Sequence, residues 1–450
     1  MDKLPYRGKT GTEAWQSLVH VCRRWRSLVF RSSRRLNLRL HCTPRTPAKD
    51  TLDIWPALPL IVEGLMTQSS STDNVIAALG QSNRVCQVDL RGLAGWQLEQ
   101  VLAAMQVPFP KLTDLRLFSD GETLGVIPDS FLGGSAPRLR HFDLSGIPFP
   151  GLTNLLLSAT HLIHLFLRDI PHSGYISPEA MVSLLSVLSN IEILYFEFRS
   201  PQSRPDWESQ RLPPPKRFVL PALSEFNFKG VTEYLEEFVT RVDTPQLVEM
   251  DVTFFNQIDF DCPRLAQFIN CTPTLRARDE VHVQFDQSVA SVILRYRKSK
   301  SSFDDLLISI SCSEPDWQLS SIEQVCNSSL PPLSTVKELY IEPRYSQLYW
   351  KNDAIEDTLW LQLLLPFAAV KNLYLSKEFA PGIAAALQEL VGDIDRTTEV
   401  LPSLQNIFVK GLGPWGPFQE NIGQFVAARR HSGHPIAISV WDNDSNMKSM

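Results

Sequence analysis

The sequence predicts an α/β solenoid, in which parallel strands form one layer and helices form a second layer behind them. Three observations support this fold class. An apolar phrase of the form Leu-x-x-Leu-x-Leu returns along the chain, helix-like segments lie between its copies, and the spacing of the copies is that of a structural repeat. The first apolar residue of each copy lies at positions 85, 112, 139, 162, 191, 223, 247, 336, 370 and 404.

Each phrase has the pattern of a strand with one buried face, because its apolar residues alternate. A proline stands two residues ahead of five phrases and keeps a helix from running into the strand. A glycine follows four phrases at one register, as a turn with unusual backbone angles requires. The prolines are Pro110, Pro137, Pro221, Pro245 and Pro402, and the glycines are Gly92, Gly146, Gly230 and Gly411.

The segments between phrases read as helices. Residues 178–188 follow an N-cap candidate at Ser177 and begin with proline, while residues 232–242, 380–390 and 418–428 carry apolar residues at helical spacing. A strand and a helix in each repeat are typical of a leucine-rich-repeat horseshoe, with strands on the concave face and helices on the convex face. A doubly wound fold is the alternative, but no switch-point motif accompanies the strands.

We expect residues 85–442 to form this leucine-rich-repeat-like solenoid, with about ten to twelve degenerate repeats. The gap between positions 247 and 336 is wide enough for about three of them, and residues 281–285 and 303–308 carry faded phrases there. Residues 33–84 are expected to be a linker or an N-terminal capping repeat, and residues 443–450 a disordered tail. Residues 1–32 precede the solenoid with a helix of different character.

That helix is amphipathic, and it resembles the closing helix of an F-box. Trp15, Leu18, Cys22, Trp25 and Val29 share one face, and Val-Cys-Arg-Arg-Trp over residues 21–25 matches a recurrent F-box phrase. Together with the repeats, the helix makes the chain similar to fungal F-box proteins with degenerate leucine-rich repeats. Only the second half of an F-box is present, because Leu4-Pro5 is followed by Tyr-Arg-Gly-Lys-Thr-Gly, which cannot start a helix.

The resemblance implies a substrate-recognition subunit of a cullin–RING ubiquitin ligase. Leu18, Cys22 and Trp25 would belong to the adaptor-docking helix, and the partners would be the ligase adaptor and a protein substrate of unknown identity. The alternative is a stand-alone leucine-rich-repeat scaffold that binds partners without the adaptor.

The substrate would bind on the concave face, where one residue of each phrase points away from the core. This row reads Asp89, Arg116, Asp143, Phe166, Tyr195, Asn227, Asp251, Tyr340, Tyr374 and Phe408. Aromatic side chains surrounded by charges are typical of protein-binding hot spots. The predicted partner-binding residues are therefore Phe166, Tyr195, Tyr340, Tyr374 and Phe408. Alternatively, other segments cover these rings, or the rings merely favour strands.

Composition favours a cytoplasmic or nuclear protein without a nucleic-acid or membrane partner. A net charge of −6 is too mild to recruit nucleic acid or an anionic membrane, and seven scattered cysteines argue against a disulfide framework. No signal-like or membrane-spanning apolar run is present. Arginines cluster over residues 23–39, which we interpret as a solvated face, with a nuclear signal or a nucleic-acid patch as the alternative.

Signals for catalysis are weak, so we expect no enzyme, no cofactor and no metal. Residues 411–416 match Gly-x-Gly-x-x-Gly, the fingerprint of an NAD-dependent enzyme, but Pro414 and Pro417 lack the N–H groups that a pyrophosphate loop uses. We interpret this stretch as a turn out of the repeats. The pairs His161/His164 and His431/His434 lack a third metal ligand nearby.

Overall fold

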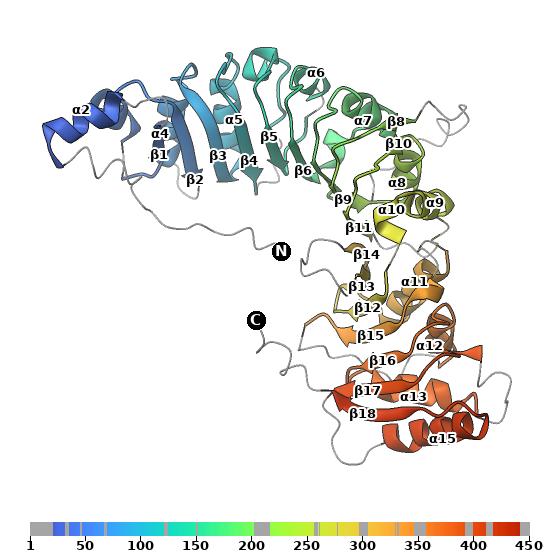
Figure 1. Ribbon diagram of the computed structural model, residues 1–450. Helices are drawn as coiled ribbons and strands as arrows, with labels where there is room; N and C mark the ends of the chain where they lie inside the picture. The colour runs from blue at the N-terminus through green and yellow to red at the C-terminus, as the bar shows by residue number, and fades with distance from the viewer. Residues whose placement is uncertain are drawn as a thin grey trace. The chain divides into compact units, whose positions relative to one another are not determined.

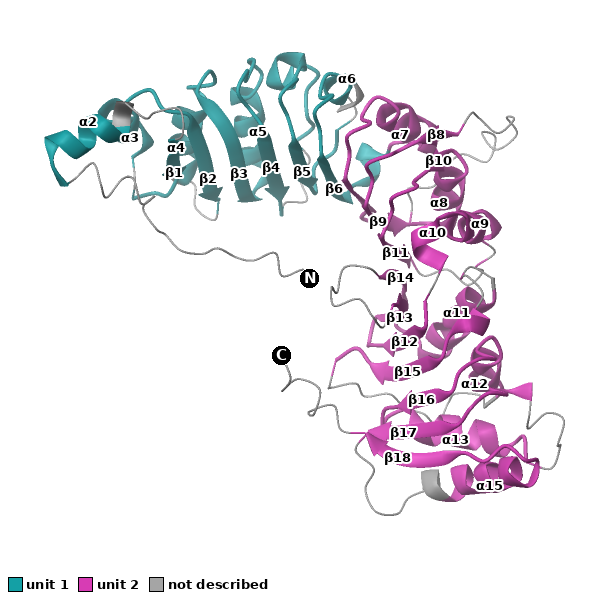
Figure 2. Cartoon of the chain, in the orientation of Figure 1, with its two compact units in different colours: residues 1–175 teal, residues 176–450 magenta. Residues whose placement is uncertain are grey.

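The computed structural model describes residues 21–31, 36–45, 47–66, 70–120, 125–149, 152–201, 217–255, 260, 262–276, 278–296, 305–328, 330, 333–345, 357–391, 399–410 and 417–441. The chain divides into two compact units, residues 1–175 and 176–450, shown in different colours in Figure 2. In each unit, most strands are followed by a helix or a short helical turn.

Unit 1 is a parallel sheet whose strands follow one another in chain order. The strands are β1 (Leu38–His41), β2 (Leu60–Leu65), β3 (Val85–Leu93), β4 (Asp114–Ser119), β5 (His141–Ser145) and β6 (His164–Ile170). The connecting helices are α3 (Ala48–Ile54), α4 (Ser70–Leu79), α5 (Gly95–Ala104), α6 (Leu152–Leu157) and the 3₁₀ turns Phe131–Gly134 and His172–Gly174. The apolar side chains of each phrase, such as Leu115 and Leu117, are fully buried on the helix side.

Unit 2 contains the strands β7 (Ile193–Phe198), β9 (Glu225–Gly230), β11 (Glu249–Phe255), β12 (Glu280–Phe285), β13 (Val289–Arg295), β14 (Leu306–Ser311), β15 (Glu338–Pro343), β16 (Asn372–Leu375), β17 (Asn406–Lys410) and β18 (Ala437–Trp441), with β8 (Phe218–Val219) paired to β10 (Val242–Asp243). Its helices are α7 (Pro178–Leu185), α8 (Thr232–Val239), α9 (Pro263–Cys271), α10 (Pro273–Arg276), α11 (Pro315–Ser328), α12 (Asp357–Leu364), α13 (Ala380–Gln388) and α15 (Pro417–His431), and a 3₁₀ turn spans Leu333–Thr335. Figure 1 shows the helices along one side of the strands in this unit.

These elements confirm the predicted α/β class and the strand–helix repeat of a leucine-rich-repeat-like solenoid. Every one of the ten phrases forms a strand, and the four segments predicted as helices are α7, α8, α13 and α15. The Ser177 Oγ accepts a hydrogen bond from the backbone N–H of Ala180 at 3.2 Å, so this residue caps α7 as the sequence indicates.

The glycines after the phrases serve two different purposes. Gly92 and Gly146 have φ values of +67° and +71°, which side chains other than glycine's rarely adopt. Gly230 is not in this region of backbone space; a Cβ there would meet the Phe228 ring at 2.5 Å, so close packing demands the glycine. Gly411 lies outside the described residues.

The stretch between β11 and β15 departs from the expected three repeats, because it contains a β-hairpin. Strand β12 pairs parallel to β15, β13 runs antiparallel between β12 and β14, and β14 returns beside β11. The Asp286 carboxylate accepts hydrogen bonds from the backbone N–H groups of Ser288 and Val289, both at 2.7 Å, and so holds a tight turn. Such a connection is too short for a helix, which a strand–helix repeat would need.

Replacing a buried leucine of a phrase should lower the stability of the fold far more than replacing a nearby exposed leucine. Leu373 in β16 is fully buried, whereas Leu365 just after α12 is 42% exposed. We expect Leu373→Ala to lower the free energy of unfolding by about 2–5 kcal/mol and Leu365→Ala by less than about 1 kcal/mol. Urea unfolding followed by circular dichroism measures both, and equal losses would contradict the assigned core.

Candidate functional site

The sheet face opposite the helices, here called the open face, carries one continuous row of side chains in unit 2. Strand pairing places one residue from each strand at the same level of the sheet. In spatial order the row is Tyr195, Asn227, Asp251, Leu307, Ile293, His282, Tyr340, Tyr374, Phe408 and Ser439. The register makes three of the predicted aromatic residues, Tyr340, Tyr374 and Phe408, direct neighbours.

Four rings of this row stack on one another, and we call His282, Tyr340, Tyr374 and Phe408 the ring ladder. Successive ring centroids are 4.3, 4.1 and 4.6 Å apart, and the ring planes deviate from parallel by 6°, 5° and 11°. The strand spacing of about 4.8 Å in a sheet brings equivalent rings to this separation. Stacked rings on adjacent strands stabilise each other and stay in fixed orientations.

Trp441 of the last strand lies across the ring ladder. Its ring centroid is 5.3 Å from that of Tyr374 and 5.7 Å from that of Tyr340, with planes tilted by 66° and 61°. The Lys410 Nζ lies 5.7 Å from the same indole ring, within reach of a cation–π interaction. The described end of the sheet thus gathers five aromatic or imidazole rings and a lysine on one face.

His282 ends the ladder between two carboxylates. Its Nε2 lies 2.5 Å from Glu280 Oε1, and its Nδ1 lies 3.1 Å from Glu342 Oε1. Burial alone would lower the pKa of His282, but the hydrogen bonds to Glu280 and Glu342 outweigh it and the pKa is raised. Because Glu342 accepts from His282 and from Gln284, its own pKa is lowered despite burial. The His282 cation is therefore favoured here.

A second row of polar side chains runs beside the ring ladder. The Asn406 side chain donates to the Asn372 Oδ1 at 2.9 Å, and the Asn372 side chain approaches the Glu338 carboxylate at 3.5 Å. The Tyr340 hydroxyl donates to the same carboxylate at 3.2 Å. Burial and the nearby Glu338 charge raise the pKa of Tyr340, so the phenol stays protonated. These contacts hold the edges of the rings in place.

The other two predicted aromatic residues stand apart from the ladder. Tyr195 shares its row in unit 2, but five strands lie between β7 and β15, and its hydroxyl donates to the Glu225 carboxylate. Phe166 belongs to unit 1, where the Arg168 guanidinium lies 4.7 Å from its ring centroid. Both are on the open face, as predicted, and both are already engaged by neighbouring charged side chains.

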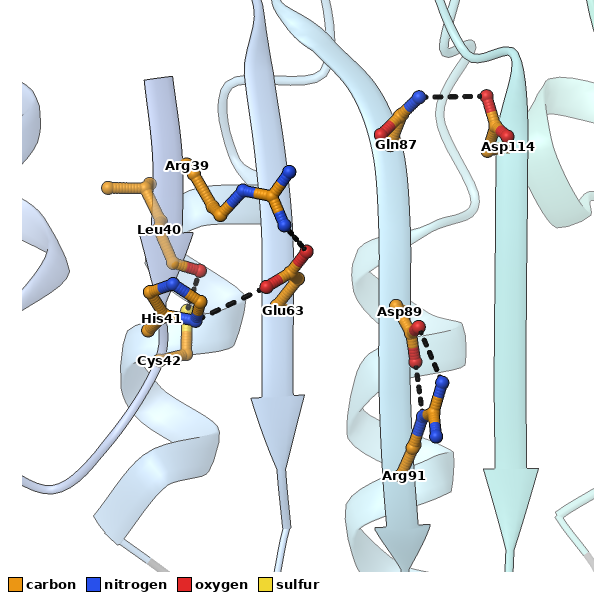
Figure 3. Close-up of polar contacts among 9 residues, drawn as sticks. All are labelled: Arg39, Leu40, His41, Cys42, Glu63, Gln87, Asp89, Arg91 and Asp114. Carbon is orange, nitrogen blue, oxygen red and sulfur yellow. Dashed lines mark hydrogen bonds and ion pairs between the residues drawn. The ribbon is translucent and has the colours of Figure 1, made fainter. Parts of the chain in front are cut away.

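The open face of unit 1 is built mainly from paired charges. Figure 3 shows Arg39 and His41 on Glu63, Arg91 on Asp89, and Gln87 on Asp114. Further along, His141 Nδ1 lies 2.6 Å from Asp114 Oδ1. Burial raises the pKa of Asp143 to about 6, although Arg168 and Arg116 oppose the shift. Its rings include His141, His164 and Phe166, whose successive centroids are 4.6 and 6.1 Å apart, and its described charges are largely matched.

Helix α2 (Arg23–Arg31) carries the described part of the predicted adaptor-docking helix. Cys22, just before it, is exposed, and the side chain of Trp25 is 46% exposed. Val21 and Leu28 are also exposed, at 66% and 53%. Leu18 and Trp15 lie outside the described residues. Trp25 and Leu28 of this helix are thus open to solvent, and Val29 is half-buried.

Sequence reasoning missed three members of the site: His282, Trp441 and Ser439. His282 lies on the alternating stretch 281–285, which contains no leucine and therefore matches the repeated phrase only weakly. Residues 437–441, Ala-Ile-Ser-Val-Trp, also lack leucine and do not match the phrase, although the sequence alternates there after a helical segment. A search for alternation alone, without the leucines, would have found both strands.

In the described part of the chain, no group of three or more His, Cys, Asp or Glu side chains has the arrangement of a metal site. No helix among the described residues is long and apolar enough to cross a membrane.

Comparison with known proteins gives a solved structure but no family. Neither a protein-family model nor a curated protein matches the chain. A solved structure similar to it is the leucine-rich-repeat-containing protein LegL7 from Legionella pneumophila, with 12% sequence identity and a TM-score of 0.28. The match covers 87% of this chain and 97% of that protein.

The raised pKa of His282 predicts a stability contribution that depends on pH. The pKa of the imidazole is 6.5 in the unfolded chain, and the hydrogen bonds to Glu280 and Glu342 raise it in the folded protein. The contribution is fully present below pH 6.5 and is lost as the pH rises through the folded pKa. The stability difference between wild type and His282→Gln should therefore shrink between pH 6 and pH 9, which urea unfolding across this range measures. When Glu280→Gln and Glu342→Gln are both present, this stability difference should depend much less on pH. An unchanged pH dependence would exclude the two carboxylates as its source.

Proposed function

We propose that this chain is a protein-binding scaffold that engages its partner through the ring ladder and Trp441. The observation that carries the proposal is the fixed stack of four rings on the open face of unit 2, in contrast to the paired charges of unit 1. His282 is buried in this stack, and the other three rings are half-buried. Aromatic side chains held in one orientation bury large apolar area upon binding at a small cost in conformational entropy.

The ladder favours binding because its rings are already held in fixed orientations. Its rings are ordered by their neighbours before a partner arrives: Tyr374 is stacked on both faces, and Tyr340 is stacked and hydrogen-bonded to Glu338. Preorganised groups lose less entropy on association than mobile ones do. The carboxylates of Glu280, Glu338 and Glu342 hold the edges of His282 and Tyr340 in this arrangement.

We further propose that the scaffold recruits its partner to a cullin–RING ubiquitin ligase as a substrate-recognition subunit. The supporting observation is the exposure of Trp25, Leu28 and Val21 on a helix whose sequence resembles that of an F-box. Exposed apolar residues on one short helix are typical of a surface that another protein covers. A stand-alone scaffold that does not bind the adaptor is the rival hypothesis.

The binding surface can be located with a photo-crosslinking amino acid. We expect benzoylphenylalanine at position 374 to give crosslinked adducts with cellular proteins, and the same residue at position 317 to give none. Trp317 is a matched control because its side chain is 47% exposed, yet it lies on helix α11. Adducts at position 317 alone would place the binding surface on the helices and contradict the proposal.

A partner identified in this way should depend on the ladder for affinity. We expect Tyr374→Ala to weaken binding by about 2 kcal/mol, roughly thirtyfold, because truncation removes a ring stacked on two others. Trp317→Ala should leave the affinity unchanged. Isothermal titration calorimetry with the purified partner measures both dissociation constants, and equal values for the two variants would refute a role for the ladder.

The ligase hypothesis makes a separate prediction about the adaptor. The full chain should bind the purified cullin adaptor, and Trp25→Ala and Leu18→Ala should weaken that binding at least about tenfold, as loss of a buried anchor does. Trp96→Ala on α5 is the control, because Trp96 is 47% exposed and outside the helix in question. Absence of adaptor binding in surface plasmon resonance would leave the stand-alone scaffold.

A further inference from the structure

The register row that forms the ring ladder does not end with its last ring. Strand β18 pairs parallel to β17, and its Ser439 stands directly beside Phe408. Side chains of paired residues in parallel strands point to the same face of the sheet, so Ser439 occupies the position that follows the ladder. Ser439 is exposed, and its hydroxymethyl group is far smaller than a ring.

The Phe408 ring consequently has one stacked face and one face toward a small neighbour. Tyr374 lies on the first face, with ring centroids 4.6 Å apart and planes 11° from parallel. Among the described residues no ring stacks on the second face, toward Ser439. Phe408 itself is only half-buried. The strand spacing of about 4.8 Å leaves room for one more planar group in the stack.

Two neighbours define the sides of this position. Trp441, two residues beyond Ser439, leans back over Tyr340 and Tyr374 rather than covering the serine. Lys410, two residues beyond Phe408, is exposed on β17 and places its ammonium group 5.7 Å from the Trp441 ring. Lys410 follows Phe408 by two residues on the same face of β17, and its positive charge there disfavours a guanidinium or ammonium group and favours a neutral ring, whose faces attract cations.

We propose that an aromatic side chain of the partner polypeptide inserts over Ser439 and stacks on Phe408 as the next ring of the ladder. This inference rests on the proposed protein-binding function and names the chemistry of the partner residue. The serine is the specificity determinant, because its small size leaves the position open. Phe408 supplies the stacking face, and Lys410 selects against cationic groups.

The experiment places an aromatic ring of this chain at the position over Ser439. In Ser439→Tyr the new ring should complete the stack, whereas Ser439→Ala changes little volume and serves as the control. A random-peptide display library is panned against the full-length wild type, and each eluted peptide is tested against Ser439→Tyr, Ser439→Ala and Phe408→Ala. Melting temperatures are measured alongside, and Ser439→Tyr should melt no lower than the wild type because the ring extends an existing stack.

We expect the eluted peptides to share an aromatic residue and to lose at least about tenfold in affinity to Ser439→Tyr, while binding Ser439→Ala unchanged. Replacing that aromatic residue by arginine should weaken binding to the wild type, and Lys410→Gln should recover part of the loss.

Peptides that lose affinity to Phe408→Ala but bind Ser439→Tyr normally would overturn the inference and leave the proposed function standing. Peptides that bind through arginine without an aromatic residue would also overturn it. Peptides indifferent to both Phe408→Ala and Ser439→Tyr, or no binding peptides at all, would count against the proposed function itself.

Discussion

In-register pairing of parallel strands is the constraint on which the rest of the structure depends. Each strand aligns its phrase with that of the next, so equivalent residues become neighbours: Leu339 beside Leu373, and Tyr340 beside Tyr374. A slip by one residue would turn every buried leucine toward solvent, and burial of a leucine is worth about 1.5–3 kcal/mol. The same register that builds the apolar core on one face therefore builds the ring ladder on the other.

The alignment of equivalent residues continues across the hairpin in unit 2. Strands β14, β13 and β12 enter between β11 and β15, and two reversals of direction restore the parallel sense on both sides. Because the insertion preserves both strand direction and side-chain face, His282 arrives beside Tyr340 and extends the row of rings. An irregularity in the chain thus supplies the imidazole end of the stack.

Electrostatics separate the open faces of the two units. In unit 1, carboxylates such as Asp89 and Asp114 meet basic partners on the same or the adjacent strand, so much of the charge is satisfied internally. In unit 2, the carboxylates near the ladder are engaged by His282 and by the Tyr340 hydroxyl, and the ring ladder remains the prominent apolar feature. Partner binding that removes rings from water releases free energy, whereas breaking matched ion pairs yields little.

By itself, the sequence determined the α/β class, the ten phrase strands, four of the helices between them and the open-face position of the five aromatic residues. These features depend on local alternation, turns and caps, which act over a few residues. The tertiary structure alone decided that Tyr340, Tyr374 and Phe408 form one stack, that Tyr195 and Phe166 stand apart, and that His282 and Trp441 join the site. Spatial neighbours depend on strand order, and the hairpin changes that order without altering any local pattern.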